Sequence, residues 1–198
     1  MFYFPRHLHN DVLIFLLRPV PYARKVGADK EVPMIHDLTR PPTDEELAEI
    51  LDSSDYRRWK ITEYEHWALY LNPSDQTLLG RSYAWLSKRH VDRMSMSELM
   101  SDELGELVYA VLRDYEQAVK RCWPGVTTVN AEWLGNTTTH HRGHGHLHLI
   151  PRYRGKVDFA GVKFIDPDHE KRRTSARIEV SDDVLEQIRF SLKSALGR

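Results

Sequence analysis

The stretch HGHLHLI at residues 144–150 carries a histidine at every second position, namely His144, His146 and His148. Side chains of a β-strand point alternately to the two faces of a sheet, so a strand here would carry all three imidazoles on one face. Gly145 and the leucines would then point to the other face. Imidazole changes charge near neutral pH, which suits it to act as a nucleophile, an acid or a metal ligand. The stretch therefore predicts a strand whose histidines carry chemistry rather than packing.

A metal site is the alternative function of these histidines. A His-x-His pair on a strand is a common pair of zinc ligands, and a third histidine two residues on could complete a set. His140 and His141 lie just upstream and add further ligands. No cysteine pair and no His-Glu-x-x-His pattern accompanies them.

Length and composition are those of one substantial domain: 198 residues, 41% hydrophobic and 29% charged. The net charge of -1 gives the whole chain no strong attraction to nucleic acid or acidic membranes, so neither is expected as a partner. The longest apolar run, Val12 to Leu17, is far too short to span a bilayer. The single Cys122 cannot form an internal disulfide, which fits a cytoplasmic protein, and we expect a buried, inert thiol.

Prolines interrupt the first sixty residues, so we expect residues 1–60 to be a largely irregular extension that packs on or flanks the domain of residues 61–198. Within it, the capping-box signature TDEE at residues 43–46 opens a helix with Leu47, Ile50 and Leu51 on one stripe. The patterns at residues 64–71 and 79–86 predict two strands.

The clearest helix is expected from the N-cap Ser101 to Pro124-Gly125. Its apolar face is predicted to comprise Leu104, Leu107, Val108, Val111, Leu112, Tyr115, Ala118, Val119 and Cys122. A strand at residues 126–134, the histidine strand ending at Pro151, a basic loop with a short strand near residues 162–164, and a helix opening at Ser181 follow. This order of elements predicts an α+β domain.

The histidine run resembles the motif of the histidine triad family, His-φ-His-φ-His-φ-φ, where φ is apolar. Other parts of residues 60–195 resemble the family as well: residues 79–90 with a Lys/Arg-x-His turn, residues 97–99 before a long helix, Asn130 with residues 134–136, and the ending HLIPRY at residues 148–153. The resemblance implies a fold with an antiparallel sheet of about five strands, one face of which is covered by the long helix and the C-terminal helix. It also implies a homodimer.

The resemblance further implies nucleotide hydrolysis or nucleotidyl transfer. In such proteins the middle histidine, here His146, attacks the α-phosphate and forms a covalent nucleotidyl-histidine, which water or another acceptor releases. The substrate would be a dinucleoside polyphosphate, a nucleoside phosphoramidate or an adenylylated group. No cofactor is required, although a polyphosphate could arrive with Mg²⁺.

Three histidines suit this chemistry for a physical reason. A neutral imidazole attacks through one nitrogen, so the other must be held protonated by a hydrogen bond, for which backbone carbonyls are the expected partners. His144 and His148 would lie about 6.5 to 7 Å from His146 along the strand. From there they could donate to phosphate oxygens or to the leaving group.

Several residues depart from the family pattern and leave two interpretations each. His140, His141 and Arg142 stand where a Gly-Gln-Ser/Thr loop is usual, and either contact the phosphate or belong to a solvated loop. Asn136 either binds phosphate or forms a turn, and Arg81 contacts a distal phosphate or lies on the surface.

Other residues have structural interpretations beside functional ones. Asn72 and Asp75 either lie near the ribose or form a turn. His90 is expected to order its loop, and Gly145 to lighten packing on the far face. Trp67, Trp85 and Trp133 are expected in the core. Two rivals to the enzyme remain: a metal-binding protein or metal-dependent hydrolase that uses the cluster of residues 140–148, and a catalytically weak nucleotide-binding protein.

Overall fold

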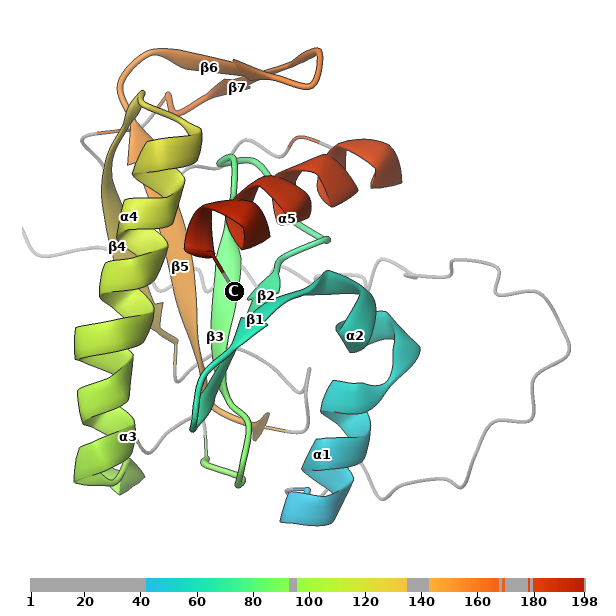
Figure 1. Cartoon of the computed structure of the whole chain (residues 1–198), viewed down its shortest axis with the longest axis vertical. Coiled ribbons are helices and arrows are strands. Elements are labelled where there is room, and N and C mark those ends of the chain that lie inside the picture. The colour runs from blue at the N-terminus through green and yellow to red at the C-terminus, as the bar shows by residue number, and fades with distance from the viewer. Residues whose placement is uncertain are drawn as a thin grey trace, which may run out of the picture. The chain divides into compact units, whose positions relative to one another are not determined.

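The computed structural model describes residues 42–92, 96–134, 143–167, 169, 178 and 180–197. Its centre is a five-stranded antiparallel sheet in the order β1-β2-β3-β5-β4 (Figure 1). The strands are β1 Lys60–Glu63, β2 Trp67–Leu71, β3 Ser82–Leu86, β4 Val126–Trp133 and β5 His146–Tyr153. A separate hairpin consists of β6 Lys156–Phe159 and β7 Val162–Ile165. The α+β fold class and the five-stranded antiparallel sheet are as the sequence predicts.

One face of the sheet is covered by the long helix and the C-terminal helix, as predicted. The long helix comprises α3 Ser101–Glu106, a π-helical segment Leu107–Leu112 and α4 Arg113–Cys122, and the C-terminal helix is α5 Asp182–Leu196. Alternate strand residues such as Leu69, Ala84 and Leu149 join both helices in the main core. Ser181 caps α5 as expected, whereas the cap of α3 is Met100 and Ser101 is the first helical residue.

Five buried residues of the long helix recur at every fourth position, with Ala118 buried beside them: Glu103, Leu107, Val111, Tyr115 and Val119. In a regular α-helix such a row drifts by roughly 40° per step, because four residues turn about 400°. The wider turns of the π-helical segment counter this drift. As a result Leu104 and Val108, which the sequence places on the buried face, are 42% and 44% exposed, and that part of the prediction is wrong.

The other face of the sheet is partly covered by two short helices, α1 Asp44–Asp52 and α2 Ser54–Trp59. The predicted capping box is present, because Thr43 and Glu46 exchange side-chain to backbone hydrogen bonds. Leu47 and Leu51 pack on Ala68, Tyr70 and Trp85 of the sheet, with Tyr56 and Tyr83 beside them. The sequence did not predict α2 or β1. The expectation of irregular structure within residues 1–60 is wrong for α2. Residues 1–41 lie outside the described part of the chain.

Strand ends differ from their predictions, and β3, for example, begins at Ser82 rather than at Leu79. β2 begins at Trp67 rather than at Tyr64, and β5 runs from His146 through Pro151 to Tyr153 instead of ending at Pro151. Proline lacks a backbone N–H and is normally excluded from central strands. Here β3 pairs with β5 only as far as Leu149, so beyond that point β5 is bonded to β4 alone. At Pro151 the side of β5 that faced β3 has no strand partner, so a backbone N–H is not needed there.

A buried ion pair ties the hairpin to the sheet. Arg152 of β5 donates to both carboxylate oxygens of Asp166, which follows β7, at 2.6 and 3.0 Å. The two side chains are 2% and 0% exposed. The predicted short strand near residues 162–164 is β7, and the sequence did not predict its partner β6.

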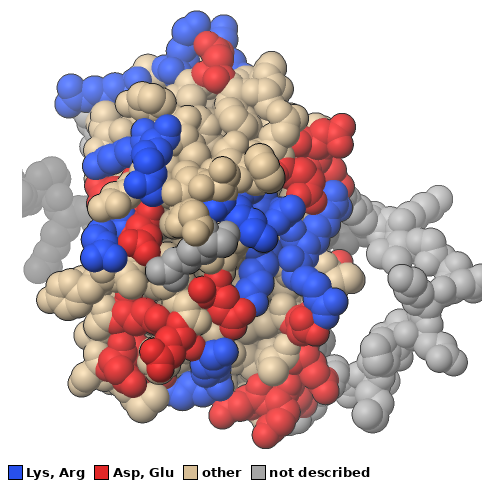
Figure 2. Space-filling view, viewed as in Figure 1, with Lys and Arg blue, Asp and Glu red and all other residues tan. Residues whose placement is uncertain are grey.

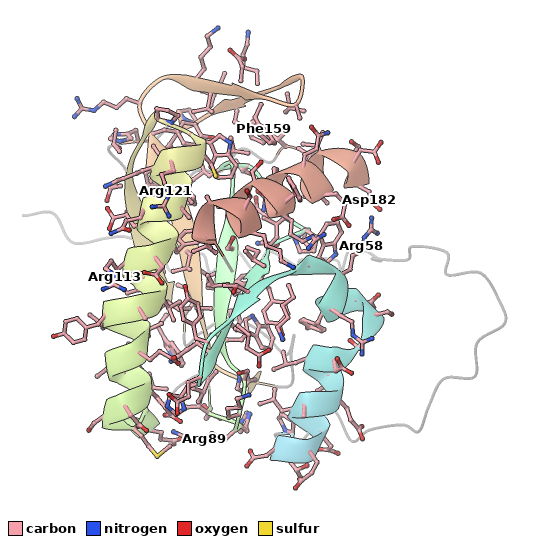
Figure 3. The ribbon with its side chains drawn as sticks, in the orientation of Figure 1. Arg58, Arg89, Arg113, Arg121, Phe159 and Asp182 are labelled. Atoms are coloured by element: carbon pink, nitrogen blue, oxygen red, sulfur yellow. The ribbon has the colours of Figure 1, made fainter. Side chains whose placement is uncertain are left out.

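Charged side chains of both signs lie side by side on the face shown in Figure 2. Arg58 of α2, for example, pairs with Asp182 and Glu186 of α5 at 3.0 Å each (Figure 3). Among the described residues, no helix has the length and apolar character that crossing a membrane would require.

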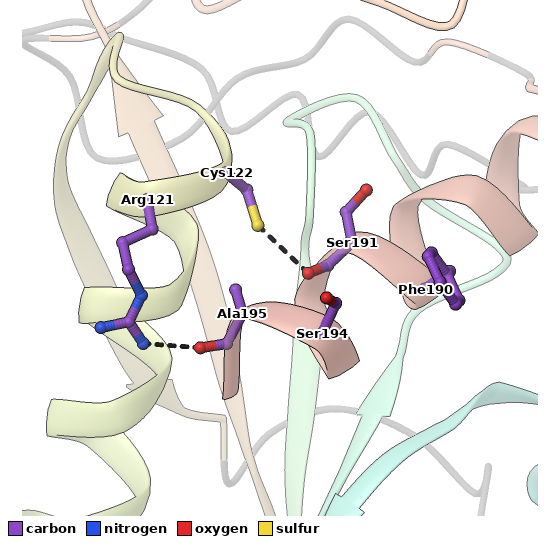
Figure 4. Close-up of a pocket in the computed structure, with 6 residues that line it drawn as sticks. All are labelled: Arg121, Cys122, Phe190, Ser191, Ser194 and Ala195. Atoms are coloured by element: carbon purple, nitrogen blue, oxygen red, sulfur yellow. Dashed lines mark hydrogen bonds between the residues drawn. The ribbon is translucent and has the colours of Figure 1, made fainter. Parts of the chain in front are cut away.

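Cys122 lines an open hollow between α4 and α5, of about 500 Å³, rather than being fully buried as expected (Figure 4). Its thiol donates to the carbonyl of Ser191 at 3.3 Å, and Arg121 donates to the carbonyl of Ala195 at 2.7 Å. Burial raises the pKa of the thiol, which therefore stays protonated.

Candidate functional site

The candidate site lies on the sheet face that α1 and α2 partly cover. Strand register places Tyr83 of β3 opposite His148 of β5, and Trp85 opposite His146. Directly opposed residues of antiparallel strands share a face, so these four rings form one aromatic group. His146 stacks on Trp85 with ring centroids 5.0 Å apart and planes 12° apart. Tyr83 meets His146 and His148 edge-on, at 5.0 and 4.9 Å.

His146 has one ring nitrogen directed at the backbone. Its Nδ1 lies 3.3 Å from the carbonyl oxygen of His144, so Nδ1 carries the proton and donates it. The Nε2 atom then carries the lone pair, which is the tautomer that a nucleophile needs. Burial lowers the pKa of the His146 imidazole below its ordinary 6.5, although the hydrogen bond to His144 opposes the change. The ring is therefore held neutral at neutral pH.

His144 lies outside β5, in an isolated bridge with Asp92, and is 1% exposed. Its Nε2 is 2.9 Å from the carbonyl oxygen of Leu86, to which it donates. Its Nδ1 accepts the backbone N–H of Val91 at 3.4 Å and is 3.2 Å from Nδ1 of His90. Both ring nitrogens of His144 are thus engaged within the protein, and its carbonyl group is the part that contacts His146.

The loop that holds His144 is itself fixed by two carboxylates. Arg89 donates to both oxygens of the buried Glu103 at 2.7 Å. Asp44 of α1 accepts the backbone N–H of His90 at 2.8 Å. The contact of His90 with His144 agrees with its expected role in ordering this loop.

His148 is 8% exposed, and its ring centroid lies 4.8 Å from that of His146. On its other side the register places Glu132 of the edge strand β4 directly opposite. His148 is therefore the neighbour that lies close enough to serve a group reacting at His146.

The remaining predicted site residues lie in two places. Asn72 is 2% exposed, and its Oδ1 accepts the backbone N–H groups of Ser74 and Asp75 at 3.0 and 3.2 Å. Arg81 forms an ion pair with Asp75 in the same β2–β3 loop. Their predicted contacts with substrate remain predictions. The other candidates lie outside the described residues: Asn136, His140, His141 and Arg142.

The sequence did not predict that Trp85 belongs to the site. Trp85 is 1% exposed, as a core residue would be, yet one of its neighbours is the nucleophile candidate. Only the pairing of β3 with β5 brings the two rings together, and no local pattern encodes that register. Trp67 is in the main core as expected, and Trp133 is half-buried.

Gly145 has no side chain, and the indole of Trp133 occupies the space beside its Cα atom. A Cβ atom at residue 145 would lie 2.3 Å from Cζ2 of Trp133. We expect Gly145→Ala to lower the free energy of unfolding by about 1–3 kcal/mol, the usual cost of overpacking. Adding Trp133→Leu should restore part of that loss, as urea denaturation of the four variants of a double-mutant cycle measures. Equal losses from Gly145→Ala with and without Trp133 would contradict this contact.

The described residues contain no group of three His, Cys, Asp or Glu side chains placed to hold a metal ion. His140 and His141, which the metal alternative uses, are not among them. Metal analysis of the purified protein therefore decides that alternative.

Comparison with solved structures gives matches among histidine triad proteins. A hypothetical histidine triad nucleotide-binding protein from Sulfolobus tokodaii is 18% identical, with a TM-score of 0.51 over 76% of this chain and 91% of that chain. A zinc-bound family member from Mycobacterium smegmatis is 18% identical, with a TM-score of 0.44 over 70% and 83% of the two chains. A Hit-like protein involved in cell-cycle regulation from Bartonella henselae, with an unknown ligand, is 14% identical, with a TM-score of 0.44 over 69% and 85%. No protein-family model and no curated protein matches the sequence.

Proposed function

We propose, from the premise that this chain has the histidine-triad fold, that it is a nucleotide hydrolase or nucleotidyl transferase with His146 as its nucleophile. The substrate would be a nucleoside phosphate derivative: a dinucleoside polyphosphate, a phosphoramidate or an adenylylated group. The observation that carries the proposal is the hydrogen bond from Nδ1 of His146 to the carbonyl of His144. It leaves the lone pair of the neutral ring on the other nitrogen.

In the first step Nε2 of His146 forms a bond to the α-phosphorus, and the bond from phosphorus to the leaving oxygen or nitrogen breaks. The modified ring gains positive charge, which the carbonyl of His144 stabilises through the proton on Nδ1. His148, 4.8 Å from His146 between ring centroids, supplies a proton to the leaving group. Water or another acceptor then attacks phosphorus and gives its proton to His148, which lost one in the first step. The P–N bond breaks and the mononucleotide leaves.

Unlike His146 and His148, His144 does not react with the substrate in this scheme. Because its ring nitrogens bond to Leu86 and Val91, we assign it the positioning of His146 through its carbonyl group. No metal is required for attack by a neutral imidazole, although Mg²⁺ can accompany a polyphosphate substrate.

The test is incubation with a panel of diadenosine polyphosphates and adenosine phosphoramidate, followed by mass spectrometry. A nucleotidylated peptide containing His146 is expected for at least one substrate. Activity that a chelator abolishes, without such a peptide, would instead favour the metal-dependent alternative.

The proposal predicts a loss of activity in acid. The attacking form of His146 is the unprotonated ring, so on the acid side kcat/KM falls about tenfold per pH unit below the pKa of His146 in the folded protein. Because burial lowers that pKa, the fall should begin below pH 6.5. Rates measured from pH 4 to 8 check it, and a rate that is unchanged down to about pH 4 would contradict the assignment.

We also propose a homodimer. Exposed apolar side chains recur at helical spacing on the long helix: Met100, Leu104 and Val108, beside Tyr109 at 76% exposed. A second copy is the partner that the resemblance implies, and contact along this stripe would remove it from water. Sedimentation equilibrium should give twice the mass of one chain.

A further inference from the structure

A line of aromatic rings connects α2 with the nucleophile candidate. Tyr56 meets Trp85 edge-on, with ring centroids 5.4 Å apart and planes 66° apart. Trp85 in turn stacks on His146 at 5.0 Å and lies 5.3 Å from His144. Tyr70 of β2 also meets Tyr56 and Trp85 edge-on, at 6.1 and 6.4 Å. Trp85 is therefore packed between the helix pair and the histidines.

The helix pair α1–α2 is held to the domain at both of its ends. At the start of α1, Asp44 accepts the backbone N–H of His90. In α2, Arg58 pairs with Asp182 and Glu186 of α5, and Figure 3 shows Arg58 next to Asp182. Between these points Leu47 and Leu51 pack in the cluster that includes Trp85.

We propose that Trp85 is a positioning residue for His146, and that α1–α2, through Tyr56, is a part of the reaction site. The inference rests on the proposed function for its kinetic consequences. The role it gives to Trp85 concerns the ring of His146 itself and can be measured without substrate.

The geometry explains why the imidazole needs such support. Its bond to the carbonyl of His144 is long, at 3.3 Å, and constrains only one edge of the ring. A near-parallel indole at 5.0 Å sets the plane of the ring. The edge of Tyr83 at 5.0 Å limits its movement from the side. Together they direct Nε2 along one line, and alignment of the reacting atom is a large part of catalysis.

The same contacts exclude water from the imidazole, which agrees with the lowered pKa of His146. The titratable groups around the ring are His144 and His148 of its own segment and Tyr83 of β3, and Glu132 of β4 lies opposite His148. A substitution at Trp85 changes none of them. A change in the titration of His146 would therefore report the loss of the indole.

The variants are Trp85→Leu, Trp85→Phe and Tyr56→Ala, with Trp67→Leu as the matched control. Trp67 is equally buried in the same sheet, but it belongs to the main core on the opposite face. All are tested in the full chain by ¹⁵N NMR titration of the imidazole nitrogens, and by kcat and KM on the substrate found above.

Trp85→Leu should lower kcat about tenfold with KM within about twofold, and should shift the pKa of His146 upward toward 6.5. Trp85→Phe should keep kcat and the pKa of His146 close to their wild-type values. Tyr56→Ala should change both in the same direction as Trp85→Leu, but by less. Trp67→Leu should leave the titration unchanged. The proposal is overturned if Trp85→Leu titrates like wild type, if the pKa falls, or if Trp67→Leu shifts it equally. Since the titration needs no substrate, it would survive a failure of the proposed activity.

Discussion

His146→Asn is expected to lower kcat by at least about a thousandfold while nucleotide affinity changes by no more than a few-fold. Asparagine keeps a side-chain N–H group that can reach the carbonyl of His144, but it has no nitrogen lone pair that can attack phosphorus. Binding depends on other contacts and should persist. Turnover and nucleotide affinity, measured separately by product analysis and calorimetry, give the two quantities.

His66→Asn is the matched control for this variant. His66 lies in the turn between β1 and β2, half-buried, with its Nε2 3.5 Å from a carboxylate oxygen of Asp102. It should keep full activity, and the covalent nucleotidyl peptide should disappear only in His146→Asn. Wild-type hydrolysis of every nucleotide by His146→Asn would remove His146 as the nucleophile.

Asp166→Ala should lower the free energy of unfolding by about 3–5 kcal/mol, because it deprives the buried Arg152 of its carboxylate. Arg152 is 2% exposed and donates to both oxygens of Asp166. A buried guanidinium cannot recover the lost interaction from water. The loss is a large part of the 5–15 kcal/mol typical of a folded domain. Chemical denaturation followed by circular dichroism measures it.

Asp158→Ala provides the comparison within the same hairpin. Lys156 and Asp158 form an ion pair at 3.4 Å, but their side chains are 61% and 59% exposed. A solvent-exposed pair of this kind contributes at most about 1 kcal/mol. Similar losses in the free energy of unfolding for Asp166→Ala and Asp158→Ala would mean that the buried pair of Arg152 and Asp166 stabilises the protein no more than an exposed pair does.

The sequence predicted the architecture because its strongest signals are local. Short runs rich in aromatic residues and bounded by turn residues marked the strands around residues 67–71 and 82–86, and the TDEE box at residues 43–46 marked the start of α1. Element ends were less accurate. Pro151 suggested a strand end, yet β5 continues because β3 has already stopped pairing. Leu104 and Val108 were misplaced because regular helical spacing does not anticipate a π-helical segment.

Part of the candidate site could likewise be predicted from local sequence, and part could not. The spacing of His146 and His148 by itself puts both rings on one face of any strand they form, and they lie 4.8 Å apart. His144 follows the same spacing, but its position beyond β5 and its bonds to Leu86 and Val91 depend on a loop more than fifty residues earlier.

What the sequence determined alone is the long helix, α1, α5, most strands of the sheet and the histidine pair, because these follow from periodicities of two and 3.6 residues within a continuous segment. What only the tertiary structure decided is the environment of those histidines. The stacking of Trp85 on His146, the support by Tyr56 and the pairing of Arg152 with Asp166 join segments far apart in the chain. Such contacts are fixed by strand register and helix docking, which arise from the simultaneous packing of the whole domain.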